Sequence, residues 1–404
     1  MKPSLNLNQK LLDKAKPYLV CVSFGPDSMA LLFSMIQLGY RVEVAHVNYH
    51  KRPESNLEQS QLEQFCLQYD VPLHVLDVRT SMRGNFQHQA RLIRYGFFKQ
   101  IVTTQHLGAI LTAHHADDDL ETATMQKARQ SLHDYYGIRY VSDWEGVPLI
   151  RPLLQTFKTN LIKFCDDHKV LYAIDASNQK PIYTRNRIRL LLSDLTEQEK
   201  LQQLNHFSLL NLELDTKKAN VKPLTQSKRF SLSSYLALDA QSQFLFWLVK
   251  SKQVGIHFSI TQAFLKKIHQ VCLSKKPNLR VQLLRGWWFE KAYDDGWVIA
   301  NAWLKPYRFS SQRSPAGLPL LRFTLNLLPP AFQKSFIRSA RPNDRLTIKD
   351  YNKAFSRLAI DWKIPRFLRE VWPVVTNRQG KILSIPRYHK NLSNQANNWF
   401  EILE

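Results

Sequence analysis

The first 120 or so residues alternate between short apolar runs and longer segments with helical periodicity. The runs expected to be strands are residues 18–22, 41–48, 73–78 and 109–113, and the segments expected to be helices are residues 29–38, 54–69 and 85–106. Strands and helices in this repeating order are typical of a parallel sheet with helices on its faces. The sequence therefore predicts an α/β fold, a doubly wound parallel sheet whose ligands bind beyond the carboxyl ends of the strands.

The loop between the first expected strand and the first expected helix is a candidate phosphate site. Its residues are Ser23, Phe24, Gly25, Pro26, Asp27 and Ser28. A loop in this position directs backbone N–H groups and the positive end of the helix dipole toward one point. Asp27 is able to hold a metal ion or to cap the helix. A plain strand-to-helix turn has the same residues, so the loop alone leaves both interpretations open.

Polar residues also follow the second and fourth expected strands, at His46 and Asn48 and again at residues 114–122. Because the carboxyl ends of parallel strands meet at one edge, we expect these residues to share a cleft with the loop at 23–28. Asp118 and Glu121 are three residues apart, which predicts two carboxylates on one face of a first helical turn. The same spacing forms a capping box, and capping is the commoner explanation for acidic residues at a helix start.

The charge of the chain points to a polyanionic partner. Lys and Arg total 56 against 33 acidic residues, which gives a formal net charge of +23. Nucleic acid is favoured over a membrane, because no apolar run reaches the roughly 18 residues of a membrane-spanning helix. The start of the chain has no hydrophobic signal segment, and we expect a cytoplasmic protein. The four cysteines are far apart, which argues against a zinc knuckle, an iron–sulfur cluster or a disulfide framework.

Basic residues cluster in three parts of the sequence. Grouped arginines suit phosphate contacts, although a solvated helix start gives the same pattern. In the last 80 or so residues, aromatic side chains stand among the cations, and this mixture suits RNA. The candidate RNA-binding residues are Arg91, Arg94, Arg185, Arg187, Arg189, Arg341, Lys353, Arg357, Lys363 and Arg366.

The sequence pattern predicts three domains. Residues 1–195 are expected to form the α/β domain, residues 196–310 a mainly helical middle domain that ends in a three-stranded meander, and residues 325–404 a small basic α+β domain. The meander strands are expected at 279–284, 287–293 and 297–303, and a hairpin is expected at 373–386. Residues 305–319, rich in Ser, Pro and Arg, are typical of a linker.

An ordered series of motifs across residues 18–190 resembles the tRNA(Ile)-lysidine synthetases of the PP-loop ATP pyrophosphatase superfamily. The matching segments are the loop at 23–28, His46-Val-Asn-Tyr, Ala90-Arg91-x-x-Arg94-Tyr95, His114-His-Ala-Asp-Asp-x-x-Glu121-Thr, Arg151-Pro-Leu-Leu, Asp175-x-Ser-Asn and Tyr183-Thr-Arg-Asn-Arg-Ile-Arg189. The chain departs from the family at Phe24, which replaces the first Gly of the loop. It departs again at Asp119, where Gln is frequent, and at residues 87–89, where an acidic residue often precedes Ala-Arg.

The resemblance implies an enzyme that uses ATP and Mg²⁺ to adenylate C2 of the wobble cytidine in a CAU-anticodon isoleucine tRNA, after which free lysine displaces AMP. It implies that the loop at 23–28, His46 and Asn48 bind ATP, and that Asp27 also holds Mg²⁺. His115, Asp118 and Glu121 would bind lysine, and Asp27 and Asp118 would be catalytic. Two rival interpretations are a tRNA thiolase, which needs paired cysteines, and a non-catalytic RNA-binding relative.

Overall fold

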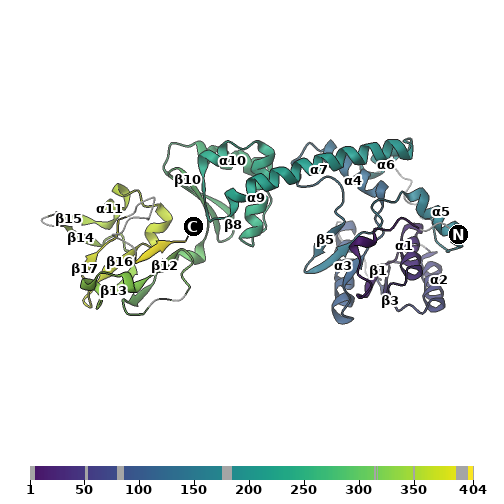
Figure 1. The fold of residues 1–404 in the computed structure, drawn as a ribbon, viewed down its shortest axis with the longest axis horizontal. Coiled ribbons are helices and arrows are strands. Elements are labelled where there is room, and N and C mark those ends of the chain that lie inside the picture. The colour runs from purple at the N-terminus through teal and green to yellow at the C-terminus, as the bar shows by residue number, and fades with distance from the viewer. Residues whose placement is uncertain are drawn as a thin grey trace. The chain divides into compact units, whose positions relative to one another are not determined.

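The computed structural model describes residues 5–50, 53–79, 86–174, 184–313, 315, 317–348, 351–387 and 399–403. The chain divides into two compact units, Met1–Leu214 and Asp215–Glu404. Figure 1 shows the elements of each unit. No helix in these described ranges is both long and apolar enough to span a membrane.

The first unit is built on a six-stranded sheet with the order β3-β2-β1-β4-β6-β5. Its strands are β1 (Tyr18–Cys21), β2 (Val42–Asn48), β3 (Leu73–Asp77), β4 (Ala109–Leu111), β5 (Val141–Trp144) and β6 (Val147–Ile150). All pairings are parallel except that of β5 with β6 at the edge. The strand order reverses direction between β1 and β4, so the predicted doubly wound parallel sheet is confirmed.

Helices cover both faces of this sheet because alternate residues of each strand point to opposite faces. Val20 of β1 packs in a core with Leu31 of α1 and Phe164 of α5. The neighbouring residue Leu19 packs in a separate core with Phe98 of α3. The helices of the unit are α1 (Pro26–Gln37), α2 (Ser55–Gln68), α3 (Phe86–Thr104), α4 (Ala116–Ala128), α5 (Lys158–His168), α6 (Thr184–Ser193) and the start of α7 (Glu197–Thr225).

The second unit begins with the end of α7, three helices and an antiparallel sheet of order β7-β10-β9-β8. These elements are β7 (Arg229–Ser231), α8 (Leu232–Leu236), α9 (Ala240–Gln253), α10 (Gln262–Leu273), β8 (Asn278–Leu284), β9 (Trp287–Ala292) and β10 (Asp295–Ala300). The predicted meander is thus confirmed, although its third strand ends three residues early, where a short 3₁₀ helix, η3 (Asn301–Leu304), begins.

The described residues of the rest of the second unit form three small sheets and one α-helix. A four-stranded sheet has the order β11-β13-β16-β17, and β12–β18 and β14–β15 form two-stranded pairs. The bounds are β11 (Arg308–Ser310), β12 (Leu321–Phe323), β13 (Phe336–Ser339), β14 (Arg345–Ile348), β15 (Tyr351–Ala354), α11 (Phe355–Asp361), η6 (Arg366–Glu370), β16 (Pro373–Thr376), β17 (Ile382–Ser384) and β18 (Phe400–Ile402). Strands β16 and β17 form the predicted hairpin.

The expected linker at residues 305–319 is wrong in part. Strand β11 lies inside it and pairs with β13, so this segment belongs to a sheet. One apolar core joins the meander to the C-terminal elements, and in it the rings of Trp297 and Phe367 are 5.2 Å apart. The Ser, Pro and Arg content wrongly indicated a linker, because an edge strand of three residues such as β11 needs little apolar sequence. The three expected domain ranges stay a prediction.

Candidate active site

The loop at 23–28 connects β1 to α1, as expected from the sequence. Gly25 caps α1 in an extended conformation, and Pro26 is the first helical residue. The hydroxyl of Ser28 donates to the carbonyl of Gly25 at 3.0 Å and accepts from the backbone N–H of Ser23 at 3.2 Å. These bonds fold the loop over the N-terminus of α1, the end of a helix that favours an anion.

Phe24 is the residue of the loop with a left-handed backbone, at φ 64°. A side chain at this φ costs on the order of 1 kcal/mol relative to Gly. The ring is 1% exposed and packs in the core formed by β1, α1 and α5, and the Phe24 carbonyl accepts from the N–H of Ala173 at 2.9 Å. Burial of the ring therefore offsets the backbone strain, and the loop keeps its turn without the glycine of the family pattern.

His46 and Asn48 are both buried near the end of β2, and both side chains form hydrogen bonds within the protein. Nδ1 of His46 lies 2.9 Å from the carbonyl of Val22, and burial lowers the pKa of this imidazole. The amide of Asn48 donates to Asn56 and Gln59 of α2 at 3.2 and 2.9 Å. These hydrogen bonds hold His46 to the strand end of β1 and Asn48 to α2, and the predicted role of both residues in ATP binding stays a prediction.

A cavity of about 770 Å³ lies at the carboxyl ends of β2 and β3. Asn56 and Gln59 line it, as do His50 and Asp77, whose Nε2 and Oδ1 are 2.7 Å apart. The sequence analysis missed these residues because each is a common surface residue, and only the adjacency of β2 and β3 brings them together.

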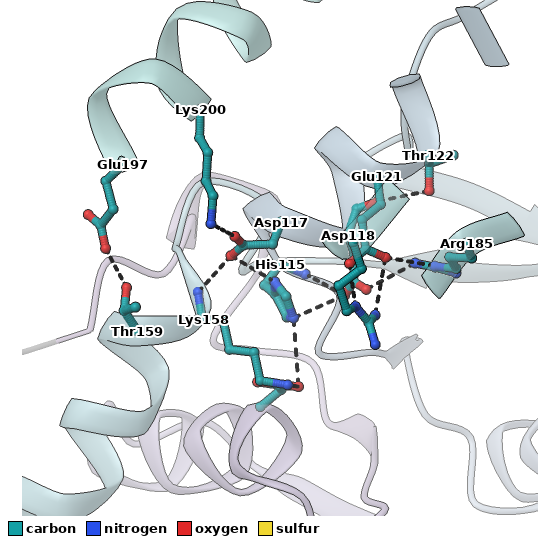
Figure 2. Close-up of polar contacts among 12 residues, drawn as sticks. His115, Asp117, Asp118, Glu121, Thr122, Lys158, Thr159, Arg185, Glu197 and Lys200 are labelled. Atoms are coloured by element: carbon teal, nitrogen blue, oxygen red, sulfur yellow. Dashed lines mark hydrogen bonds and ion pairs between the residues drawn. The ribbon is translucent and has the colours of Figure 1, made fainter. Parts of the chain in front are cut away.

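His115 is the centre of a carboxylate cluster at the start of α4, and Figure 2 shows it beside Asp117 and Asp118. Its Nε2 lies 3.3 Å from Asp118 and 3.7 Å from Asp27, which belongs to the loop at 23–28. Its Nδ1 lies 3.5 Å from Asp117. His115 itself is 4% exposed. The loop after β1 and the cluster after β4 are therefore in contact, whereas the shared cleft with His46 and Asn48 stays a prediction.

The charged groups of the cluster shift one another's pKa values. Burial disfavours the imidazolium of His115, but the surrounding carboxylates outweigh burial and raise its pKa. For Asp118, burial favours the neutral acid, but His115, His114 and Arg185 outweigh it and lower the pKa. For Asp117, burial likewise favours the neutral acid, but hydrogen bonds with His115, Lys158 and Lys200 outweigh burial and lower the pKa. Both aspartates are therefore carboxylates at neutral pH.

Asp118 and Glu121 belong to α4, and their carboxylates contact a second helix, α6. Arg185 donates to Glu121 at 2.8 Å and to Asp118 at 3.0 Å, and Arg189 donates to Glu121 at 2.6 and 3.1 Å. The capping box of α4 is formed by His115 as the N-cap and Asp118, which accepts from the His115 N–H at 3.3 Å, and not by Asp118 with Glu121. Arg185 and Arg189, expected at RNA phosphates, are held by carboxylates here.

Two lysines from distant elements complete the cluster, and sequence reasoning missed both. Lys158, at the start of α5, lies 3.6 Å from Asp27 through its ammonium and donates its backbone N–H to Asp117 at 2.9 Å. Lys200, near the start of α7, donates to the other oxygen of Asp117 at 2.9 Å, as Figure 2 shows. No local pattern identifies them, since only the fold brings these helix starts to α4.

The other predicted RNA-binding residues are placed as follows. Arg91 lies 4.6 Å from the ring of Tyr95 and 5.6 Å from that of Trp144, and Arg94 and Arg187 are exposed. In the second unit Arg341, Arg357, Lys363 and Arg366 are exposed, whereas Lys353 pairs with Asp361 at 2.9 Å. Residues 87 and 88 lie outside the description of side chains, as do residues 175–183 of the matched motifs.

Asp27 fits the predicted Mg²⁺ contact in one respect. Its Oδ1 is buried and has no hydrogen-bond partner in the described part of the chain, and its Oδ2 faces His115 and Lys158. Mg²⁺ is usually held by one or two carboxylates together with substrate phosphates, so a single free carboxylate oxygen beside a phosphate loop is sufficient. Among the described residues there is no group of three or more His, Cys, Asp or Glu arranged to hold a metal without such a substrate.

The chain is similar in sequence to a known domain family and to several curated proteins. Residues 3–195 match the model of the PP-loop domain family. A tRNA(Ile)-lysidine synthase of Ureaplasma parvum is 42% identical over 201 residues, which cover 48% of this chain and 60% of that protein. A bifunctional TilS/HprT protein of Listeria monocytogenes is 28% identical over 92% of this chain and 65% of its own length.

The match to the curated relatives is partial in length. This chain spans 50% to 65% of the length of the first four of them. A solved structure of a U34-tRNA thiolase from Methanococcus maripaludis aligns with a TM-score of 0.43 and 12% identity, covering 51% of this chain and 76% of that one. The sequence matches confirm the predicted resemblance to the lysidine synthetases.

Proposed function

We propose that this chain, whose residues 3–195 match the PP-loop domain family and which is similar to curated tRNA(Ile)-lysidine synthases, ligates lysine to C2 of the wobble cytidine in a CAU-anticodon isoleucine tRNA. ATP first adenylates the C2 oxygen and releases pyrophosphate. The ε-amine of free lysine then attacks C2, AMP leaves, and one proton is released. We infer from this reaction that the protein works in the cytoplasm.

The observation that carries the proposal is the contact between the phosphate loop and the α4 cluster. Nε2 of His115 lies 3.7 Å from Asp27 of the loop and 3.3 Å from Asp118 of α4. An activated α-phosphate at the N-terminus of α1 and an amine beside Asp118 would therefore be neighbours. Placing two reactants side by side in this way supplies much of the rate of a transfer reaction.

In the adenylation step, the N-terminus of α1 and the loop at 23–28 would bind the triphosphate. Lys158 lies at the edge of this loop, 3.6 Å from Asp27, and adds a positive charge for pyrophosphate. Asp27 would hold Mg²⁺, which neutralises phosphate charge when bound. Ser23 and Ser28 contribute hydroxyl groups that already lie 3.4 Å apart.

In the lysine step, Asp118 fits the binding of an ammonium group better than the removal of its proton. The lowered pKa keeps Asp118 ionised, and a weakly basic carboxylate is a poor proton acceptor for an amine of pKa about 10.4. Arg185 and Arg189 hold Asp118 and Glu121 now. Free lysine carries an ammonium and a carboxylate. Its ammonium can pair with Asp118 or Glu121, and its carboxylate can then pair with the arginine that this carboxylate releases.

The decisive experiment is incubation of the full chain with ATP, labelled lysine and total tRNA. Label in a single isoleucine tRNA, together with AMP and pyrophosphate in equal amounts, supports the proposal. AMP formation with sulfur transfer in place of lysine transfer would favour a thiolase. Binding of tRNA with no nucleotide turnover would favour a non-catalytic relative, for which the strained Phe24 loop is the motivating observation.

A further inference from the structure

The second unit contains a basic cavity that the reaction described above does not use. It has a volume of about 610 Å³ and is formed by the loop after α10, the turn between β9 and β10, and the segment after α11. Its positively charged lining residues are Lys275, Lys276, Lys291, Lys363 and Arg387, and Trp362 and Tyr293 contribute aromatic rings. A cavity of this size is large enough for a ligand such as a single nucleotide.

Five basic residues and three acidic residues, Asp294, Asp295 and Asp361, line the cavity, so its lining keeps a net positive charge. Asp361 pairs with Lys353 at 2.9 Å, and Asp295 pairs with Arg229 at 3.3 Å, and neither cation belongs to the lining. In contrast, the ammonium groups of Lys275, Lys276 and Lys363 form no ion pair within the described ranges, and all three residues are exposed. The cavity therefore presents three available cations to an anionic ligand.

Hydrogen bonds hold in place the loop that carries Lys275 and Lys276. Lys291 is 5% exposed, and its ammonium donates to the carbonyls of Cys272, at 2.9 Å, and Ser274. The hydroxyl of Ser274 accepts from the N–H of Lys276 at 3.2 Å, and the carbonyl of Pro277 accepts from the N–H of Tyr293 at 2.6 Å. A loop fixed by these bonds loses little conformational entropy when it binds a ligand.

We propose that this cavity binds an unpaired nucleotide of RNA, with the base against Trp362 and the phosphates near Lys275, Lys276 and Lys363. Trp362 is half-buried and lines the cavity, as a stacking platform must. A base in a duplex cannot reach such a platform, whereas an unpaired base can leave its neighbours and stack on an aromatic ring. The identification of the ligand as RNA rests on the proposed function, because tRNA is the polyanion of that reaction.

The test uses the full chain and a fluorescently labelled single-stranded RNA tetranucleotide, with a blunt-ended RNA duplex, compared at equal phosphate concentration, as the competitor class. We expect the tetranucleotide to bind more tightly than the duplex. Lys275→Gln with Lys276→Gln should weaken tetranucleotide binding and lower the slope of log K against log salt by about 0.7 for each phosphate that is no longer neutralised. Trp362→Leu should weaken it roughly fivefold or more, and Trp362→Phe should retain most of it.

The matched control is Lys266→Gln with Lys267→Gln, which removes the same charge from exposed positions of α10 outside the cavity. This control should leave the affinity within about twofold and the salt slope unchanged. Equal weakening in the control and cavity variants, or equal binding of duplex and tetranucleotide, would overturn the proposal. Because Lys275 and Lys276 are exposed, their replacement keeps the test valid even if Trp362→Leu fails to fold.

Failure of this inference is distinguishable from failure of the proposed function. Lysine transfer to tRNA is read at the α4 cluster of the first unit, and tetranucleotide affinity needs neither ATP nor lysine. A chain that transfers lysine but shows no effect of the cavity variants contradicts only the nucleotide site. A chain that binds the tetranucleotide through Lys275 and Trp362 but transfers no lysine contradicts only the reaction.

Discussion

Arg189 of α6 donates two hydrogen bonds to the carboxylate of Glu121 in α4, from Nε at 2.6 Å and from Nη2 at 3.1 Å. The side chain of Glu121 is 4% exposed, so its charge depends on guanidinium partners rather than on water. The two helices also share an apolar contact, because Leu120 and Ile188 lie in one core. The lysine-binding carboxylates that we propose are therefore part of the contact that holds α6.

Glu121→Gln should both destabilise the first unit and raise the KM for lysine. The amide cannot satisfy two arginines as a carboxylate does, and we expect a decrease of about 1–3 kcal/mol in the free energy of unfolding. Urea unfolding and lysine titrations measure the two effects. Glu197→Gln is the control, since this exposed carboxylate accepts only from Thr159 among the described residues and should change little. A destabilised variant with an unchanged KM would leave Glu121 with a structural role alone.

Asp27→Asn should abolish the formation of AMP while tRNA still binds. The substitution removes a carboxylate whose buried Oδ1 has no partner among the described residues, and this is the atom we assign to Mg²⁺. The measurement is AMP release with ATP and tRNA, beside tRNA affinity from a filter or anisotropy assay. Asp13→Asn, at a position before β1 and outside the loop, is the matched control. Adenylation at the normal rate in Asp27→Asn would mean that ATP binds elsewhere.

Phe24→Gly tests whether strain or burial dominates in the loop. Glycine relieves a left-handed backbone that costs on the order of 1 kcal/mol, but removal of a fully buried phenyl ring costs about 3–5 kcal/mol. The variant should therefore be less stable by about 2–4 kcal/mol, as measured from urea midpoints. Phe24→Leu keeps most of the volume and should be destabilised less. An increase in stability in Phe24→Gly would contradict the proposed offset.

Local sequence patterns were sufficient for strands β1 to β4 and for the loop at 23–28, whereas β5 and β6 were not among the expected strands. The apolar runs of β1 and β2 lie at the expected residues because strands buried on both faces need continuous apolar sequence. Phe24, at the position where the family pattern has Gly, has a positive φ, which is the conformation that would explain a Gly there. These features depend on residues that are neighbours along the chain.

The ion pairs of the site depend on residues that are far apart in sequence, and they could not be predicted in the same way. Periodicity places Arg185 and Arg189 on one face of α6 but does not say whether that face meets RNA or Glu121. Lys200 reaches Asp117 from 83 residues away. The strand at Arg308–Ser310 was missed for a similar reason, because its partner β13 identifies it rather than its own composition.

Stability of the second unit should depend on pH through Lys250. This residue is 2% exposed, donates to the carbonyls of Thr225 and Ser227, and has its pKa lowered by burial to about 8. Between about pH 8 and the ordinary lysine pKa of 10.5, the unfolded chain binds more protons, so stability should rise with pH relative to Lys250→Met. The expected difference is at most about 3 kcal/mol. A difference that falls over this range would contradict a desolvated ammonium.

The C-terminal cations should contribute to tRNA binding through exposed arginines rather than through every basic residue. Arg338 pairs with Asp344 at 2.7 Å and Lys353 pairs with Asp361 at 2.9 Å, so neither charge is available without breaking an ion pair. Arg341, Arg357 and Arg366 remain exposed. Their joint replacement by Gln should lower the slope of log K against log salt by roughly 2, if each contacts one phosphate.

This substitution in the full chain is preferable to deletion of residues 325–404. The segment shares a core with Trp297 and Ile299 of β10, and its removal would expose that core and confound binding with unfolding. The control triple is Lys252→Gln, Lys266→Gln and Lys267→Gln, which removes equal charge from exposed positions on α9 and α10. We expect weaker tRNA binding and a shallower salt dependence in the arginine triple alone, with unchanged ATP binding, because the nucleotide loop belongs to the first unit. Equal slopes in the two triples would mean that tRNA senses only the net charge of the chain.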